Sequence, residues 1–240
     1  VLARDGLYPY NEGALRRARG GRLEAIGVDC ATLDLAEAAE TAAFFGGAKL
    51  THVAHMAAQP GVRYSLVNPS AYLRNNIDAF GNVLEGCRHG GVGLAHLVYA
   101  SSSSVYGANH TLPFSEDQRV DRPVSFYAAT KRANELMAHS YSHLYRLPTT
   151  ALRFFTVYGP WGRPDMSPAI FARAILAGEI IEVFNGGQLR RDVTHIDDIV
   201  DGVLGALEHP STDNGTEPPA TTHNLGNPRT LELEPCLSVI

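Results

Sequence analysis

Two residues of the segment YAATK, Tyr127 and Lys131, have types and a spacing that could support proton transfer. Side chains four residues apart lie on one face of a helix. A tyrosine is a poor base at neutral pH because the pKa of its phenol is about 10, and a neighbouring cation lowers that pKa. We therefore predict that Tyr127 is a catalytic base activated by Lys131. The alternative is an incidental pair on a surface helix.

A run of serines at residues 101–104 follows directly after the apolar segment HLVYA. A hydroxyl at the end of a strand can hydrogen-bond a substrate hydroxyl and help to move its proton to Tyr127. Ser102 is the candidate for this role. The alternative is a polar turn in which the serines bond the local backbone.

Short apolar runs alternate with longer helical patterns along the chain. They predict strands at residues 51–57, 95–101, 149–155 and 222–226, and helices near 70–88, 125–145, 167–177 and 197–208. Apolar runs that barely alternate suit strands covered on both faces, so the predicted fold class is α/β with a doubly wound parallel sheet. Ligands of such sheets bind at the carboxyl ends of strands, where the serine motif lies.

The composition excludes several classes of protein. A chain of 240 residues, 45% hydrophobic and 19% charged, suits an ordinary globular protein of one or two domains. A net charge of −5 without a basic run argues against nucleic acid or an anionic membrane surface as the main partner. No stretch approaches the roughly 18 apolar residues of a spanning helix. The three cysteines are far apart, which indicates reduced thiols, and no metal site is predicted.

At these motifs the chain resembles the extended short-chain dehydrogenase/reductase superfamily, in its branch of NAD-dependent sugar-nucleotide epimerases and dehydratases. The resemblance covers nearly the whole chain. Within the branch, LRFFTVYGPWGRPDM is most similar to the UDP-glucuronate 4-epimerases of plants and bacteria. The other segments that carry the resemblance are HMAAQPGVRYS, the pair Asn75 and Asn76, SSSSVYG, YAATK and RRDVTHIDDIV.

The resemblance implies NAD as the cofactor and assigns roles to single residues. Tyr127 matches the catalytic base, Lys131 the residue that lowers its pKa and holds the nicotinamide ribose, and Ser102 the relaying hydroxyl. The positions that match cofactor-binding ones are Asp29 and Cys30 at the adenine, Ala57, Ala58, Asn76, Tyr127 and Lys131. The positions that match substrate-binding ones are Thr156 and Arg163 at the sugar carboxylate, Arg191 at the diphosphate, and Ser103. Arg63 is a weaker candidate for the sugar carboxylate.

The implied reaction is the C4 epimerisation of a UDP-hexuronate, UDP-glucuronate to UDP-galacturonate, through a 4-keto intermediate. Related decarboxylases and 4,6-dehydratases carry carboxylates where this chain has Ser103 and Ser104. Serine is a poor proton acceptor, which favours simple epimerisation. The alternatives are a UDP-sugar decarboxylase, a 4-epimerase of another nucleotide sugar, and a non-catalytic fragment or paralogue with the same fold.

The N-terminal part departs from the family. Family members open with a strand and a G-x-x-G-x-x-G turn that holds the pyrophosphate, and this sequence lacks that motif. We therefore expect the Rossmann-like sheet to lack its N-terminal strand-helix unit, and the substrate domain to be small and truncated. The expected division assigns residues 1–158, with 192–225, to the NAD-binding domain, and 159–191 and 226–240 to the substrate-binding domain.

The resemblance also implies partners and a location. The partners are a UDP-sugar substrate and a second copy of the chain, in a homodimer formed through the helices near 70–88 and 125–145. We expect a cytoplasmic protein, or a Golgi protein if the full-length polypeptide carries an upstream membrane anchor.

Overall fold

The structure is a computed structural model that describes residues 1–6, 13–90, 93–181, 190–227 and 230–232. Its central sheet has four parallel strands in the order β3-β4-β5-β8. The strands are β3 (His52–His55), β4 (His96–Ser102), β5 (Thr149–Phe154) and β8 (Ala220–Leu225). Each lies within two residues of the bounds expected from the sequence, and the parallel sheet is confirmed.

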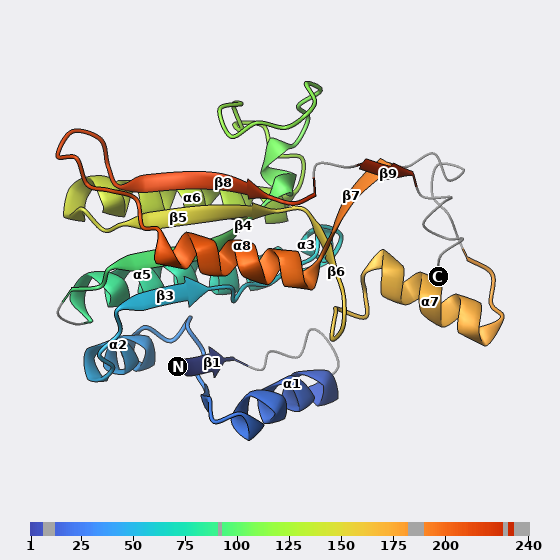
Figure 1. Cartoon of the computed structure of the whole chain (residues 1–240), viewed down its shortest axis with the longest axis horizontal. Coiled ribbons are helices and arrows are strands. Elements are labelled where there is room, and N and C mark those ends of the chain that lie inside the picture. Colours follow the sequence, from blue (N-terminus) through green and yellow to red (C-terminus); the bar gives the residue numbers. More distant parts are fainter. Residues whose placement is uncertain (7–12, 91–92, 182–189, 228–229, 233–240) are drawn as a thin grey trace.

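Helices cover both faces of this sheet, as a doubly wound fold requires. Helices α5 (Ala79–His89) and α6 (Phe126–Tyr145) pack on one face and α8 (Ile196–Glu208) packs on the other (Figure 1). The main core lies under α5 and α6, where Phe80, Leu84, Leu97 and Tyr99 are almost fully buried. Each such apolar side chain contributes about 1.5–3 kcal/mol by its burial.

The helix expected near residues 70–88 is a composite. Helix α4 (Pro69–Tyr72) passes into a π-helical turn, η1 (Leu73–Asp78), and then into α5. Helix α3 (Tyr64–Val67) precedes them. The widened turn places Asn76 inside the protein, with only 2% of its surface exposed. Such π turns occur frequently at functional sites.

The N-terminal part contains elements that the sequence did not reveal. Strands β1 (Leu2–Asp5) and β2 (Asp29–Thr32) pair in parallel, helix α1 (Gly13–Ala25) joins them, and α2 (Ala38–Gly47) leads to β3. The segments LARD and DCAT contain no apolar run, and α1 has three glycines, four arginines and no buried side chain. Strands β1 and β2 and helix α1 therefore carry little of the apolar periodicity on which sequence-based recognition depends.

The sheet is nevertheless interrupted. Among the described residues, β1 pairs only with β2, and β3 pairs only with β4. The order β2-β1 followed by β3-β4-β5 corresponds to the usual order 3-2-1-4-5-6 without its strand 1, and β8 extends the sheet by one further strand. The break lies at the place of strand 1, which carries the glycine-rich turn in the family and was expected to be missing. Strands 2 and 3 of that order are present as β1 and β2.

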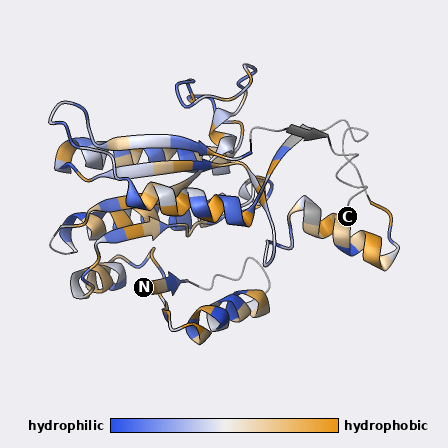
Figure 2. Cartoon of the chain, viewed as in Figure 1, coloured by the Kyte–Doolittle hydropathy of each residue, from blue (hydrophilic) through white to orange (hydrophobic). Residues whose placement is uncertain are grey.

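A second, smaller sheet contains β6 (Thr156–Tyr158), β7 (Arg190–His195) and β9 (Thr230–Glu232). It begins at Thr156, two residues before the expected domain boundary, while α8 and β8 return to the central sheet as expected. Helix α7 (Ser167–Ala177) follows β6 and is rich in apolar residues (Figure 2). The division into two domains remains a prediction.

Candidate functional site

Ser102 is the last residue of β4 and caps the short helix η2 (Ser103–Tyr106). Its Oγ accepts hydrogen bonds from the backbone nitrogen of Ser104 at 3.2 Å and from the Ser104 hydroxyl at 2.8 Å. Because both lone pairs of this oxygen are used, its own hydrogen is left to donate. Ser102 is hydrogen-bonded to the phenol of Tyr127. The structure thus joins the expected relay hydroxyl to the expected base.

Helix α6 begins beside this hydroxyl. Ser125 caps it, because its side chain accepts a hydrogen bond from the backbone nitrogen of Ala128 at 3.1 Å. Tyr127 lies in the first turn and Lys131 one turn later. Lys131 is buried, and its Nζ donates to the carbonyl oxygen of Ala100 in β4 at 2.8 Å. The two side chains are thereby held at the carboxyl end of the sheet.

Burial raises the pKa of the Tyr127 phenol, while the hydrogen bond from Ser102 and the charge of Arg163 counteract it. Lys131 was expected to lower this pKa, and that role stays a prediction. The groups that lower the pKa in the structure are Ser102 and Arg163, while the Lys131 ammonium donates to the backbone of β4. Burial also lowers the pKa of Lys131 to about 8.

His55, which ends β3, is a neighbour of this centre that the sequence analysis did not select. Burial lowers the pKa of His55 to about 3, and the charge of Lys131 adds to the effect. Its ring stacks on Phe80 with the centroids 5.4 Å apart. His55 is therefore neutral at pH 7 and adds no second positive charge beside Lys131.

Arg163 lies in the turn that follows β6. Its charge acts on the Tyr127 phenol, and its Nε donates to Asp165 Oδ1 at 3.0 Å. The guanidinium therefore already binds a carboxylate within the protein, which is the chemistry that a sugar carboxylate would require. Thr156 begins β6 and is partly exposed.

Asn76 acts as a clamp between two segments. Its Oδ1 accepts from the backbone nitrogen of Gln59 at 2.7 Å. Its Nδ2 donates to Gln59 O at 3.2 Å and to Thr130 Oγ1 at 3.0 Å. Both amide hydrogens are used within the protein. Asn76 therefore holds the loop that contains Ala57 and Ala58 against α6, and it is placed to position that loop for a cofactor.

The structure does not bring Asp29 and Cys30 to the other candidate residues. They begin β2, and Asp29 forms an ion pair of 3.2 Å with Arg4, whereas ligands of parallel sheets bind at the carboxyl ends of strands. Asp34 and Leu35 follow the end of β2, and they also have the acidic and aliphatic types that the resemblance requires. The bounds of a four-residue strand could not be inferred from the sequence precisely enough to decide whether Asp29 and Cys30 or Asp34 and Leu35 lie at its carboxyl end.

The remaining candidates are placed less centrally. Ser103 follows Ser102 in η2 and is partly exposed. Arg63 is exposed at the start of α3. Arg191 belongs to β7 through its backbone, and its side chain lies outside the described part of the structure.

A buried ion pair supports the site, and the sequence analysis missed it. Arg153 Nε and Nη2 donate to the two oxygens of Glu135 at 2.9 and 3.0 Å, and Ser101 Oγ donates to Glu135 Oε1 at 2.6 Å. Arg132 Nη1 adds a fourth bond at 2.9 Å. Burial disfavours the Glu135 carboxylate, but these donors outweigh it and lower its pKa. A sequence signal existed, since Glu135 lies four residues after Lys131 on the same helix face.

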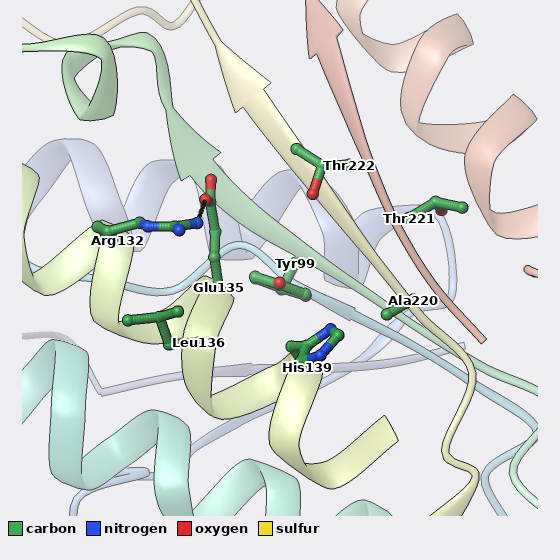
Figure 3. A pocket seen from close by; sticks show the side chains of 8 residues that line it. All are labelled: Tyr99, Arg132, Glu135, Leu136, His139, Ala220, Thr221 and Thr222. Atoms are coloured by element: carbon green, nitrogen blue, oxygen red, sulfur yellow. Dashed lines mark hydrogen bonds and ion pairs between the residues drawn. The ribbon is translucent and has the colours of Figure 1, made fainter. Parts of the chain in front are cut away.

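A cavity of about 300 Å³ lies between α6 and β8, and Glu135 is part of its lining (Figure 3). Its lining does not include Tyr127 or Ser102, so it is separate from the candidate catalytic centre. The lining residues are Tyr99, Arg132, Glu135, Leu136, His139, Ala220, Thr221 and Thr222.

Within the described part of the chain, no group of three or more His, Cys, Asp or Glu side chains is arranged to hold a metal ion. None of the described helices combines the length and the apolar character needed to cross a membrane.

Comparisons with known proteins agree with this geometry. The uncharacterized 37.6 kDa protein in the cld 5' region of Escherichia coli O111:H- is 46% identical over 244 residues, which are 97% of this chain and 72% of that protein. UDP-glucuronate 4-epimerase 3 of Arabidopsis thaliana is 46% identical over 249 residues, across 100% of this chain and 58% of the plant protein. The chain thus spans less than two thirds of that plant relative.

Among solved structures, UDP-glucuronic acid 4-epimerase from Bacillus cereus, in complex with UDP-glucuronic acid and NAD, matches with a TM-score of 0.86 and 30% identity. The match covers 98% of this chain and 71% of that one. The model of the NAD dependent epimerase/dehydratase family matches residues 8–224. Since this match includes most of the sequence and both chemical motifs, the chain belongs to the NAD dependent epimerase/dehydratase family.

Proposed function

We propose that this chain carries the catalytic centre of an NAD-dependent enzyme that converts UDP-glucuronate to UDP-galacturonate. The convergence of Tyr127, Ser102 and Arg163 carries the proposal. A phenol hydrogen-bonded to a serine can exchange a proton with a sugar hydroxyl, and a guanidinium can bind the sugar carboxylate. The relatives named as UDP-glucuronate 4-epimerases support this substrate.

The residues present fit the nicotinamide half of NAD. The buried ammonium of Lys131 has three hydrogens, and among the described residues one of them is donated, to Ala100 O. The other two suit ribose hydroxyls, and the small side chains of Ala57 and Ala58 would leave room for a cofactor. When bound, NAD supplies the acceptor and the donor of the hydride at C4. Asn76 holds the alanine loop in place.

Proton transfer is the task of the chain's own residues. The Tyr127 phenolate accepts the proton of the C4 hydroxyl, with the Ser102 hydroxyl as the bridge between the two oxygens. Tyr127 returns the proton when the hydroxyl forms again with the opposite configuration. Arg163 and Thr156 hold the sugar carboxylate, and this restraint opposes the loss of carbon dioxide. Ser103, Arg63 and Arg191 complete the proposed substrate-binding set.

The experiment that tests this function is a product analysis. The full-length protein is incubated with UDP-glucuronate and NAD, and the nucleotide sugars are separated by chromatography. UDP-galacturonate with no net consumption of NAD is the expected result. Release of carbon dioxide, or a 4-keto-6-deoxy sugar, would instead establish a decarboxylase or a dehydratase.

We also propose a homodimer and a cytoplasmic location. Leu144 of α6 is 64% exposed, which supports an apolar contact there. Cys30 and Cys87 are free thiols, which supports a reducing compartment. Sedimentation of the protein with and without the substitution Leu144→Glu measures the proposed association. A monomer at micromolar concentration of the unaltered protein would contradict it.

A further inference from the structure

The turn that carries Arg163 has an unusual backbone. Trp161, two residues before Arg163, has a φ of 64°, in the left-handed region that residues other than glycine rarely adopt. Its side chain is 45% exposed, so burial of the indole does not by itself account for this conformation. Residues kept in such a conformation need support from their surroundings, and they are frequent at functional sites.

Helix α1 supplies that support. Arg19 Nη2 donates to the carbonyl oxygen of Trp161 and, at 3.2 Å, to that of Gly162. Arg22 places its guanidinium carbon 4.7 Å from the centre of the Trp161 ring, in a cation–π arrangement. Two arginines of one helix therefore bind the backbone and the side chain of the same turn, beside which α1 lies in Figure 1.

These contacts bear directly on Arg163. The Gly162 carbonyl belongs to the peptide group that joins Gly162 to Arg163, so the bond from Arg19 fixes the plane from which the Arg163 side chain departs. Arg163 in turn acts on the Tyr127 phenol. Helix α1 has no buried side chain, so polar groups at its surface make these contacts with the turn.

We propose that Arg19 and Arg22 of α1 are positioning residues that orient Arg163 toward the carboxylate of the sugar nucleotide. The helix thereby couples the two-stranded N-terminal sheet to the specificity of the substrate site. The part of this inference that concerns the substrate rests on the proposed function, while the contact between α1 and the turn does not.

The contact can be measured without any activity, because Trp161 is the only tryptophan in the 240-residue sequence. We expect the substitutions Arg22→Ala and Arg19→Ala each to shift the tryptophan emission to longer wavelength and to increase its quenching by acrylamide. Arg17→Ala removes the same charge from an exposed position of α1 and serves as the matched control. Arg22→Lys, which keeps a cation over the ring, should restore most of the unaltered emission. Unchanged emission in both alanine variants, with circular dichroism showing a folded chain, would overturn the proposal.

The second measurement tests the consequence for the substrate. In the full-length protein loaded with NAD, Arg19→Ala should weaken the binding of UDP-glucuronate by about 10-fold, or about 1.4 kcal/mol. The binding of UDP-glucose should weaken much less. Arg19→Lys should recover part of the loss, and Arg17→Ala should leave both affinities unchanged. An equal loss for both sugars, or none, would overturn the positioning role. If the unaltered protein does not distinguish the two sugars, the proposed function fails, whatever the emission of Trp161 shows.

Discussion

Single residues decide the chemistry of the site, and Tyr127 is the first to test. The substitution Tyr127→Phe removes only the ionisable oxygen, so the packing of the ring against Tyr72, with the centroids 6.1 Å apart, is retained. We expect turnover in the full-length protein to fall by about 10²–10⁴-fold, as for other positioned acid-base groups. Calorimetric titration with UDP-glucuronate serves as the control, since binding should persist. A rate close to that of the unaltered protein would show that another residue is the base.

Ser102 has an effect that pH can reveal. Its hydrogen bond lowers the pKa of Tyr127 against the opposing effect of burial. In Ser102→Ala that pKa should therefore rise, and the phenolate should form only at higher pH. The ascending limb of kcat/KM against pH should move to higher pH. Ser140→Ala, which changes an exposed hydroxyl on α6, is the matched control. An ascending limb that stays in place would show that Ser102 does not influence the base.

Arg163 is the residue from which substrate selectivity is expected. In Arg163→Leu, UDP-glucuronate should lose about 1.5–3 kcal/mol of binding free energy, roughly ten- to a hundredfold in affinity, because a charge-assisted pair is lost. UDP-glucose has no carboxylate at C6 and should be affected much less. Arg173→Leu makes the same change at an exposed position of α7. Competition assays with the two nucleotide sugars measure the difference, and equal losses would assign Arg163 a structural role.

At the scale of elements, the buried pair of Glu135 and Arg153 ties α6 to β5 and, through Ser101, to β4. Breaking a buried ion pair leaves one charge without its partner, at a cost of about 3–5 kcal/mol. We expect Arg153→Met to lower the free energy of unfolding by that amount in urea titrations. Arg146→Met, at the exposed pair with Asp213, should have a smaller effect. Equal effects of the two substitutions would contradict this role of the buried pair.

The same pair gives stability a pH dependence with a definite sign. The pKa of Glu135 is lower in the folded protein than its ordinary value of 4.5. Its contribution to stability is therefore fully present above pH 4.5 and is lost as the pH falls through the folded-state pKa. The destabilising effect of Arg153→Met should accordingly shrink in unfolding experiments at acidic pH.

The elements also show what a sequence can and cannot predict. Helix α6 has a clear start at Ser125 and a buried stripe, and its bounds were predicted to within one residue. The π-helical turn η1 leaves no such mark, because the residues LRNNID are equally compatible with an ordinary helical turn. The clamp role of Asn76 and the contact of Arg19 with Trp161 depend on partners far away in the sequence, so spacing alone could not reveal them.

At the scale of the whole molecule, the chain has a nearly complete sheet with one interruption. Strands β1 and β3 each lack a hydrogen-bonded neighbour on one side among the described residues. Membership of the family and the parallel sheet followed from motifs in the sequence. The interruption followed from the missing glycine-rich turn. Strands β1 and β2 and helix α1 did not follow because they bury no apolar side chain. Helix α2 did not follow either, although its Phe45 is buried in the main core.

This interruption leads to a prediction for the binding of NAD. In related folds the backbone amides of a glycine-rich turn and the N-terminus of the following helix hold the pyrophosphate. The 240 residues contain no such turn, and Gly20, Gly21, Gly46 and Gly47 all lie within helices α1 and α2. The residues that suit the nicotinamide half, Lys131 and the loop of Ala57 and Ala58, remain. We therefore expect the 240-residue chain to bind NAD only weakly.

Isothermal titration of NAD into the 240-residue chain measures this affinity, with nicotinamide mononucleotide as the comparison ligand. Because nicotinamide mononucleotide lacks the pyrophosphate and the adenosine, the two ligands should bind with similar, weak affinity if Lys131 and the alanine loop make the main contacts. Lys131→Met should then weaken the binding of NAD and of nicotinamide mononucleotide to the same extent. A dissociation constant near 1 μM for NAD, about 8.2 kcal/mol of binding free energy, would contradict the expectation. In that case other backbone amides of the chain, such as those that follow β1, would have to take the place of the glycine-rich turn.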